Sequence, residues 1–220
     1  MVELIDIFLL RKKVGQLVAE RPGLGKTIVA WILVYILYSI LAIFWNFVSS
    51  VIAALLGYGD LSGVVALNLI GIVFSIIIIP IAIIIGLIFA LISDAVVFLF
   101  AKLLGGKGYG FMQFFSVSLY VTAAVYLLMA IILPLFFIPF LNILVLILLF
   151  LYCLYLTTML IKAYFELSTI KAVLAWLIPA ILFIILLIVL IIIIILIVGA
   201  SFAALLSSAS TGGPASLPFS

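Results

Sequence analysis

Asp94 is the one acidic residue that lies close to a long apolar segment of the chain. A carboxylate at membrane depth can bind a proton or a cation, and it commonly marks an ion or proton path. The neighbouring Ser93 offers a structural alternative, because a Ser-Asp pair can cap the start of a helix. We expect Lys102 or Lys107 near Asp94 at the same interface, where a cation suits a helix end. We favour capping and keep transport as the alternative.

Most side chains that carry out catalysis are missing. The chain has no histidine and a single cysteine, Cys153, which excludes zinc sites, haem ligation, Ser-His or Cys-His catalysis and intramolecular disulfides. Cys153 lies in an apolar run, and we expect it to be a small buried hydrophobe. Gly25-Lys26-Thr27 match the end of a phosphate-binding loop, but Glu20 stands where the first glycine belongs. We predict no catalytic residues, no metal site and no cofactor.

Hydroxyl groups cluster in two apolar segments, around residues 116–126 and 152–158. Such groups could line a polar pathway, but in membrane helices they more often form hydrogen bonds between packed helices. We expect helix packing and keep the polar cavity as an alternative. The intramembrane polar candidates are Asp94, Tyr120, Tyr126, Tyr155 and Glu166.

The composition places most of the surface in lipid. Of the 220 residues, 71% are hydrophobic and 7% are charged, whereas a soluble domain has about 25% charged residues. The mean hydropathy is +1.78. A water-soluble globule is therefore excluded, and at about 20 apolar residues per crossing the chain has room for about four to six spans.

We predict an all-α membrane bundle with five spans, over residues 27–56, 64–91, 111–137, 141–161 and 172–198. The second apolar segment continues to residue 104 and would measure about 61 Å, about twice the hydrocarbon thickness. We expect Pro80 to kink this segment. We expect Ser93 and Asp94 to start a new short helix over residues 95–104, along or just beyond the interface.

The two ends of the chain differ from the spans. Residues 1–24 have polar and apolar positions on separate helical faces, which predicts an interfacial amphipathic helix before a membrane domain over residues 25–204. Arg11, Lys12 and Lys13 could then reach anionic head groups, at about 1 kcal/mol each. Residues 205–220 are small and polar, and we expect a flexible tail.

On five alternating crossings, all nine Lys and Arg residues fall on one side. This positive-inside pattern predicts a cytoplasmic N-terminus and an outer C-terminus. It also explains the basic pI without nucleic acid. Lys162 and Glu166 are four residues apart and should pair. The residues that we expect to contact lipid head groups or a partner are Arg11, Lys12, Lys13, Lys107, Lys162 and Lys171.

The order of these pieces resembles the Yip1 family of five-span membrane proteins, over about residues 4–190. The resemblance is carried by the leader LLRKKVGQLVAERPGLGKTI, by the turn LLGGKGYGFMQFFSVSLY, and by PLFFIPFLNIL and LYCLYLTTMLIKAYFELSTIKAVLAWLIP around spans four and five. The turn Gly105-Gly106-Lys107 before Tyr120 is especially similar to the family pattern. The short, Ile-rich form is most similar to a prokaryotic or archaeal member.

The resemblance implies an all-α membrane protein with a cytosolic N-terminus that forms homo- or hetero-oligomers. Eukaryotic members act in vesicle transport and contact small GTPases of the Rab type. This chain lacks their long N-terminal region, and its Asp60-Leu61-Ser62-Gly63 falls on the outer side, so small GTPase binding is doubtful. We predict a non-enzymatic scaffold or partner-binding subunit in membrane organisation or trafficking. The alternative is a transporter or channel for a small solute or ion.

Overall fold

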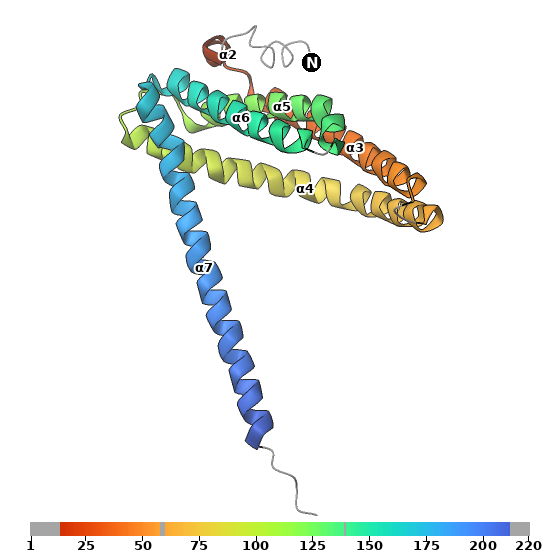
Figure 1. The fold of residues 1–220 in the computed structure, drawn as a ribbon. Helices are drawn as coiled ribbons and strands as arrows, with labels where there is room; N and C mark the ends of the chain where they lie inside the picture. The colour runs from red at the N-terminus through yellow and green to blue at the C-terminus, as the bar shows by residue number, and fades with distance from the viewer. Residues whose placement is uncertain (1–13, 58–59, 139, 212–220) are drawn as a thin grey trace, which may run out of the picture. The chain divides into compact units, whose positions relative to one another are not determined.

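A computed structural model of the protein describes residues 14–57, 60–138 and 140–211, and within these ranges every regular element is a helix. The elements are α2 (Val14–Glu20), α3 (Leu24–Leu55), α4 (Leu61–Leu103), α5 (Phe111–Ile132), the 3-10 helix η1 (Leu133–Phe137), α6 (Leu141–Phe165) and α7 (Thr169–Thr211) (Figure 1). Five helices are long and apolar enough to cross a membrane. The predicted all-α, multi-pass architecture is therefore confirmed.

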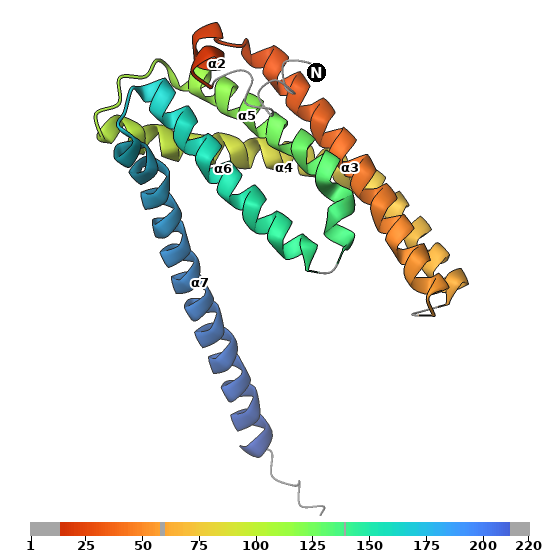
Figure 2. The same ribbon diagram turned by 45° about the horizontal axis from the view of Figure 1, so that its top comes forward.

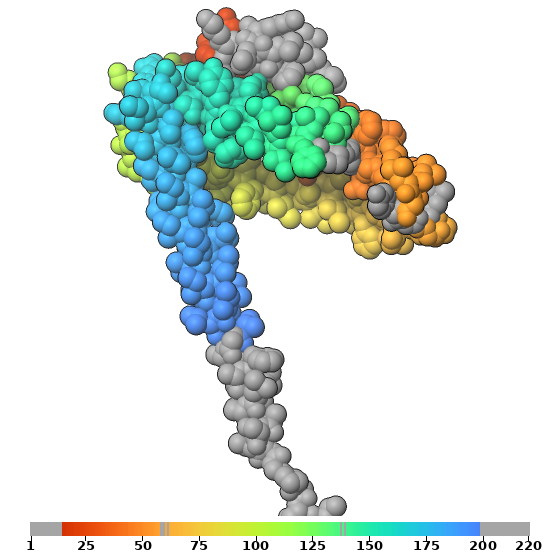
Figure 3. Space-filling model, in the orientation of Figure 1, coloured from red at the N-terminus to blue at the C-terminus, as the bar shows by residue number. Residues whose placement is uncertain are grey.

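Helices α3, α4, α5 and α6 form a bundle, and α5 contacts each of the other three. Figure 2 shows α5 between α3 and α6, and Figure 3 shows α6 covering it from one side. The rings of Phe98, Phe114, Tyr164 and Phe165 meet with centroids 5.0–6.0 Å apart. Because buried rings remove much apolar area from their surroundings, this cluster holds the end of α4, the start of α5 and the end of α6 together.

Helix α4 corrects the prediction for residues 64–104. It is one uninterrupted helix from Leu61 to Leu103, with Pro80 inside it, and no new helix begins at Ser93 and Asp94. One face of the expected interfacial segment packs against the bundle, and the other face is exposed. Ala101 is fully buried, and Phe98 packs against the core. Burial of these apolar groups among aromatic rings outweighs any tendency to lie along the interface.

The N-terminal helix is described only over Val14–Glu20. Leu17 in this helix is 3% exposed, and α2 contacts α6, so its apolar side rests on protein. The predicted interfacial helix over residues 1–24 is not confirmed. Arg11, Lys12 and Lys13 lie outside the described residues.

Residues from Leu177 onward are a separate unit that contains most of α7. The side chains from Ile181 to Val198 are 45–65% exposed, and a helix that is apolar on every side suits a lipid environment. The helix continues to Thr211, so residues 205–211 are helical where we predicted a flexible tail. Ala, Leu and Ser tolerate a helix, and the first strong helix breaker is Gly212. The remainder of that tail lies outside the described residues.

The hairpin of α3 and α4 is longer than the hairpin of α5 and α6. Helices α3, α4 and α6 have 32, 43 and 25 residues, which correspond to about 48, 64 and 37 Å. In both ribbon views the tip between α3 and α4 reaches beyond the turn between α5 and α6 (Figures 1 and 2).

Candidate functional site

At one end of the bundle, hydrogen bonds connect segments that lie far apart in the sequence. The backbone N–H of Lys107 donates to the carbonyl of Phe165 at 3.0 Å, which joins the α4–α5 turn to the end of α6. The Ser116 hydroxyl donates to the Pro22 carbonyl at 2.6 Å, which joins α5 to the chain before α3. The described cations lie at this end, which we call the basic end: Arg21, Lys26, Lys102, Lys107, Lys162 and Lys171.

The glycine-rich turn between α4 and α5 allows a very close approach to α6. A Cβ atom at Gly108 would lie 2.7 Å from ring carbons of both Tyr164 and Phe165. A Cβ atom at Gly106 would lie 2.9 Å from Phe165. The Tyr164 hydroxyl donates to the Gly110 carbonyl at 2.8 Å. Only glycine fits these positions, so the turn is held in one conformation while Lys107 is exposed to solvent.

Several cations at the basic end are anchored to the protein. Lys171 Nζ donates to the Leu104 carbonyl at 3.1 Å, where the last carbonyls of α4 need donors. Lys102 Nζ donates to the Gly108 carbonyl, and the Arg21 guanidinium lies 4.0 Å from the ring centroid of Tyr109. An ammonium group has three donors. Lys102 and Lys171 are exposed and keep donors for a further acceptor.

The expected pair of Lys162 and Glu166 is replaced by other contacts. Lys162 Nζ donates to the Thr169 hydroxyl at 3.0 Å. Glu166 is the C-cap of α6, with the left-handed φ of 54°, and it is exposed. Glu166 therefore lies one residue beyond the candidate span Leu141–Phe165, and its role as an intramembrane residue stays a prediction.

The far end of the bundle carries an acid. Asp60 caps α4 by accepting hydrogen bonds from the Ser62 hydroxyl and from the Gly63 N–H, the latter at 2.9 Å. These hydrogen bonds, the one from Ser62 first, hold the pKa of Asp60 below its ordinary value. Among the described residues, the basic end carries six cations and the two acids Glu20 and Glu166, whereas the far end carries Asp60 and no Lys or Arg. The two ends of the bundle therefore still differ in net charge.

The structure places the intramembrane candidates in different environments. Asp94 does not cap a helix, because α4 continues through it; its Oδ1 accepts a hydrogen bond from the Ser118 hydroxyl at 3.0 Å. The Tyr126 ring packs near Tyr35 and Tyr38 in the interface of α3 and α5. Tyr120 is buried in the core, whereas Tyr155 is 46% exposed on α6. The expected helix-packing role is confirmed for Ser116 and Ser118.

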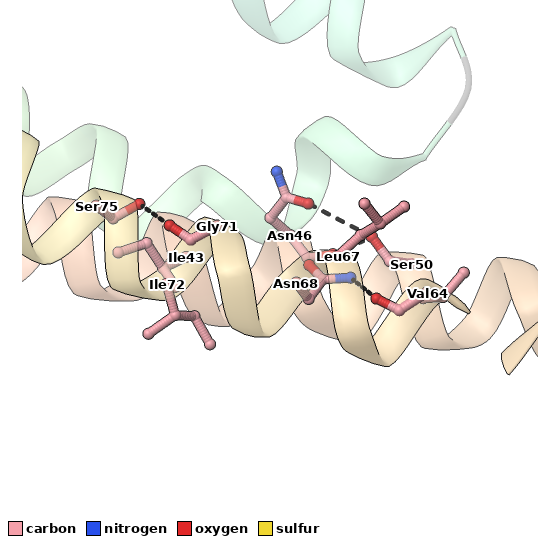
Figure 4. A pocket seen from close by; sticks show the side chains of 9 residues that line it. All are labelled: Ile43, Asn46, Ser50, Val64, Leu67, Asn68, Gly71, Ile72 and Ser75. Atoms are coloured by element: carbon pink, nitrogen blue, oxygen red, sulfur yellow. Dashed lines mark hydrogen bonds between the residues drawn. The ribbon is translucent and has the colours of Figure 1, made fainter. Parts of the chain in front are cut away.

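Two polar features were not found from the sequence. The Thr27 hydroxyl meets that of Ser116 at 3.0 Å, and Thr27 is fully buried. The positions 27, 31, 35 and 38 of α3 are spaced by one helical turn, and that spacing was a usable signal. The second feature is a groove between α3 and α4 (Figure 4). It is lined by Ile43, Asn46, Ser50, Val64, Leu67, Asn68, Gly71, Ile72 and Ser75.

Comparisons with protein families, with curated proteins and with solved structures find no match to this chain. The fold and the site define a multi-pass membrane protein with a basic end and an apolar core that contains a few hydrogen-bonded polar side chains.

Proposed function

We propose that this protein is a non-enzymatic membrane scaffold whose basic end holds anionic lipid head groups. One observation carries the proposal. The exposed cations Lys26, Lys102, Lys107, Lys162 and Lys171 share one end of the bundle, and Asp60 lies at the other. A lysine near an anionic membrane surface gains about 1 kcal/mol. Several lysines at the same end of the bundle should therefore favour binding to a leaflet that contains anionic lipids.

The packing at the basic end supports this role. Lys102 and Lys171 are fixed to backbone carbonyls, and the tight glycine turn fixes the backbone of Lys107. Groups that are already ordered lose less conformational freedom when they bind. The site is therefore suited to hold head groups in place rather than merely to attract them.

The sharpest test removes charge without reversing it. Native mass spectrometry would compare retention of phosphatidylglycerol and phosphatidylcholine by the purified protein. Changing Lys107, Lys162 and Lys171 together to Gln should weaken the binding free energy of the anionic lipid by about 3 kcal/mol. The preference for the anionic lipid should then fall about 100-fold. The matched control changes the same three residues to Arg and keeps the preference. Equal retention by the Gln variant and the natural protein would refute the proposal.

The proposal includes an orientation, with the basic end in the cytoplasm and the C-terminus outside. A Cys153→Ala background provides a chain without native thiols. In that background, Lys107→Cys should react with an impermeant maleimide only from the cytoplasmic side. Ser207→Cys should react only from outside. Labelling of both positions from one side would overturn the orientation.

The resemblance to the Yip1 family extends the proposal to assembly. We propose that the protein acts as a homo-oligomer or as a subunit of a membrane complex, in membrane organisation or trafficking. Mass photometry in lipid nanodiscs measures the size of the particle. A single chain in every nanodisc, at all protein-to-lipid ratios, would contradict assembly with itself. Co-purification from native membranes that survives Lys107→Glu would contradict partner binding through the basic end.

A further inference from the structure

Polar side chains from three helices meet in the interface of α3, α4 and α5. On α5, Ser118, Thr122 and Tyr126 follow one another at intervals of four residues and share one face. Ser118 donates to Asp94 of α4 at 3.0 Å, and the Thr122 hydroxyl donates to the Ser118 carbonyl at 3.0 Å. The Tyr126 ring lies 5.7 Å from that of Tyr38 on α3, measured between centroids. These polar side chains form a row along the interface of α3, α4 and α5, which we call the polar file.

Asp94 has no ionic partner in this file. Its carboxyl accepts a hydrogen bond from the Ser118 hydroxyl, and among the described residues it forms no ion pair. Lys102, the next cation on α4, lies two turns further along and donates to the Gly108 carbonyl. The buried residues Thr27 and Trp31 of α3 are uncharged. The side chain of Asp94 is partly buried, and a carboxylate without an ionic partner in such a helix commonly binds a proton or a cation.

Asp94 lies within α4, one of the helices that is long and apolar enough to cross a membrane. It stands nine residues before Leu103, the last residue of α4. That separation corresponds to about 14 Å along the helix, a large part of one leaflet's hydrocarbon. A proton on this carboxyl would therefore be held at depth rather than at the surface.

A second observation is a buried hydrogen-bond donor in the same interface that lacks an acceptor. Trp31 is 2% exposed, and within the described chain its indole N–H has no hydrogen-bond partner. The indole lies against Gly86 of α4 and packs on Tyr35 and Tyr126, with ring centroids 5.3 and 6.2 Å away. Buried donors in proteins are nearly always satisfied, and ordered water commonly supplies the acceptor. The orphaned N–H therefore points to water within this interface.

Along α3 and α4, a groove lies between the tyrosines of the file and the end that carries Asp60. Its volume is about 410 Å³, which is room for several water molecules. Asn46, Ser50, Asn68 and Ser75 give it a polar lining in which the side chains bond to their own helices (Figure 4). Ile43, also in the lining, is five residues beyond Tyr38 on α3, about 8 Å along the helix. Water in the groove therefore comes close to the tyrosines.

We propose that this interface is a proton path in which Asp94 holds the proton in transit. Water in the groove delivers a proton to the hydroxyls of Tyr38 and Tyr126. Thr122 and Ser118 pass it on, with bound water between them. The proton adds to a carboxylate oxygen of Asp94 and gives the neutral acid, and its release to water towards the basic end restores the carboxylate. No other bond forms or breaks, and the proposal does not depend on lipid binding.

Proton flux into sealed vesicles tests the proposal. The full chain is reconstituted into liposomes that contain pyranine, and a potassium diffusion potential set with valinomycin drives protons inward. The natural protein should acidify the vesicles faster than protein-free liposomes do. Asp94→Asn should reduce the rate to that of protein-free liposomes. Asp60→Asn, which makes the same change at the exposed tip, should leave the rate unchanged. No flux from the natural protein, or full flux from Asp94→Asn, would overturn the proposal.

Two further measurements separate the path from a structural effect. Tyr126→Phe keeps the ring packing and removes one hydroxyl of the file, so it should slow the flux. Tyr155→Phe, on the exposed side of α6, should not. Infrared spectra should contain a carboxylic-acid carbonyl band that is lost in Asp94→Asn and retained in Asp60→Asn. Absence of that band from the natural protein, or sodium flux through Asp94 at constant pH, would overturn the assignment of the proton as the bound species.

Discussion

Gly108→Ala is the most direct test of how the basic end is built. The added Cβ would lie 2.7 Å from Tyr164 and from Phe165, which is closer than carbon atoms approach in proteins. Overpacking of this kind costs about 1–3 kcal/mol. Displacement of Tyr164 would also break its hydrogen bond to Gly110, at a further cost of about 1 kcal/mol. We expect a total loss of about 2–4 kcal/mol in the free energy of unfolding.

The assay is unfolding of the purified protein in mixed micelles by titration with sodium dodecyl sulfate, followed by tryptophan fluorescence and circular dichroism. The matched control is Gly25→Ala in the first turn of α3, where a Cβ meets no atom within 4 Å. That control should leave the stability unchanged or raise it slightly, because alanine favours the helix. Equal stability of Gly108→Ala and Gly25→Ala would refute the argument that the turn requires glycine for close contact.

Three further changes test other parts of the bundle. Ser116→Ala removes a buried hydroxyl that joins α5 to the chain before α3, and it should cost about 1–3 kcal/mol by thermal unfolding in detergent; an unchanged midpoint would contradict this. Gly86→Val should strongly lower the midpoint, because a Cβ there lies 3.2 Å from an indole, whereas Gly71→Val meets open space and should not. The Asp60 cap should weaken in acid: because the folded pKa of Asp60 lies below 3.8, its contribution is complete above that value and is lost as the pH falls through the folded pKa. Hydrogen-exchange protection of the Gly63 amide, corrected for the intrinsic rate, should fall in that range, and Asp60→Asn should remove the pH dependence.

The spans could be predicted from the sequence because long apolar runs and turn residues mark helix ends directly. Helices α5 and α6 begin at Phe111 and Leu141, directly after turns rich in glycine and proline. Helix α4 could not be predicted correctly, because in the sequence an aspartate that caps a helix looks the same as an aspartate in mid-helix that contacts a neighbouring helix, as Asp94 does. What decides between them is Ser118, which is 24 residues away in the chain. A contact between residues so far apart in the chain leaves no trace in the sequence around either residue.

The candidate site was predictable to the extent that it depends on charge. The one-sided placement of Lys107, Lys162 and Lys171 follows from the order of spans, and the structure brings their segments to one end. The polar interface of α3, α4 and α5 depends on which helices are neighbours. Periodicity along a single helix does not contain that information, so the approach of Trp31 to Gly86 emerges only from the packing.

The unequal lengths of the two hairpins bear on the surrounding bilayer. Helix α6 measures about 37 Å and fits a hydrocarbon core of about 30 Å within the usual range of tilt, whereas the 43 residues of α4 correspond to about 64 Å. Exposed apolar side chains such as Val73 and Phe74 continue along the extra length. Lipids beside α4 must stretch, or the hairpin must lean, while lipids beside α6 remain relaxed. The bundle of α3 to α6 thus presents two different apolar lengths to the bilayer, and we expect it to favour places where thick and thin regions of a bilayer adjoin.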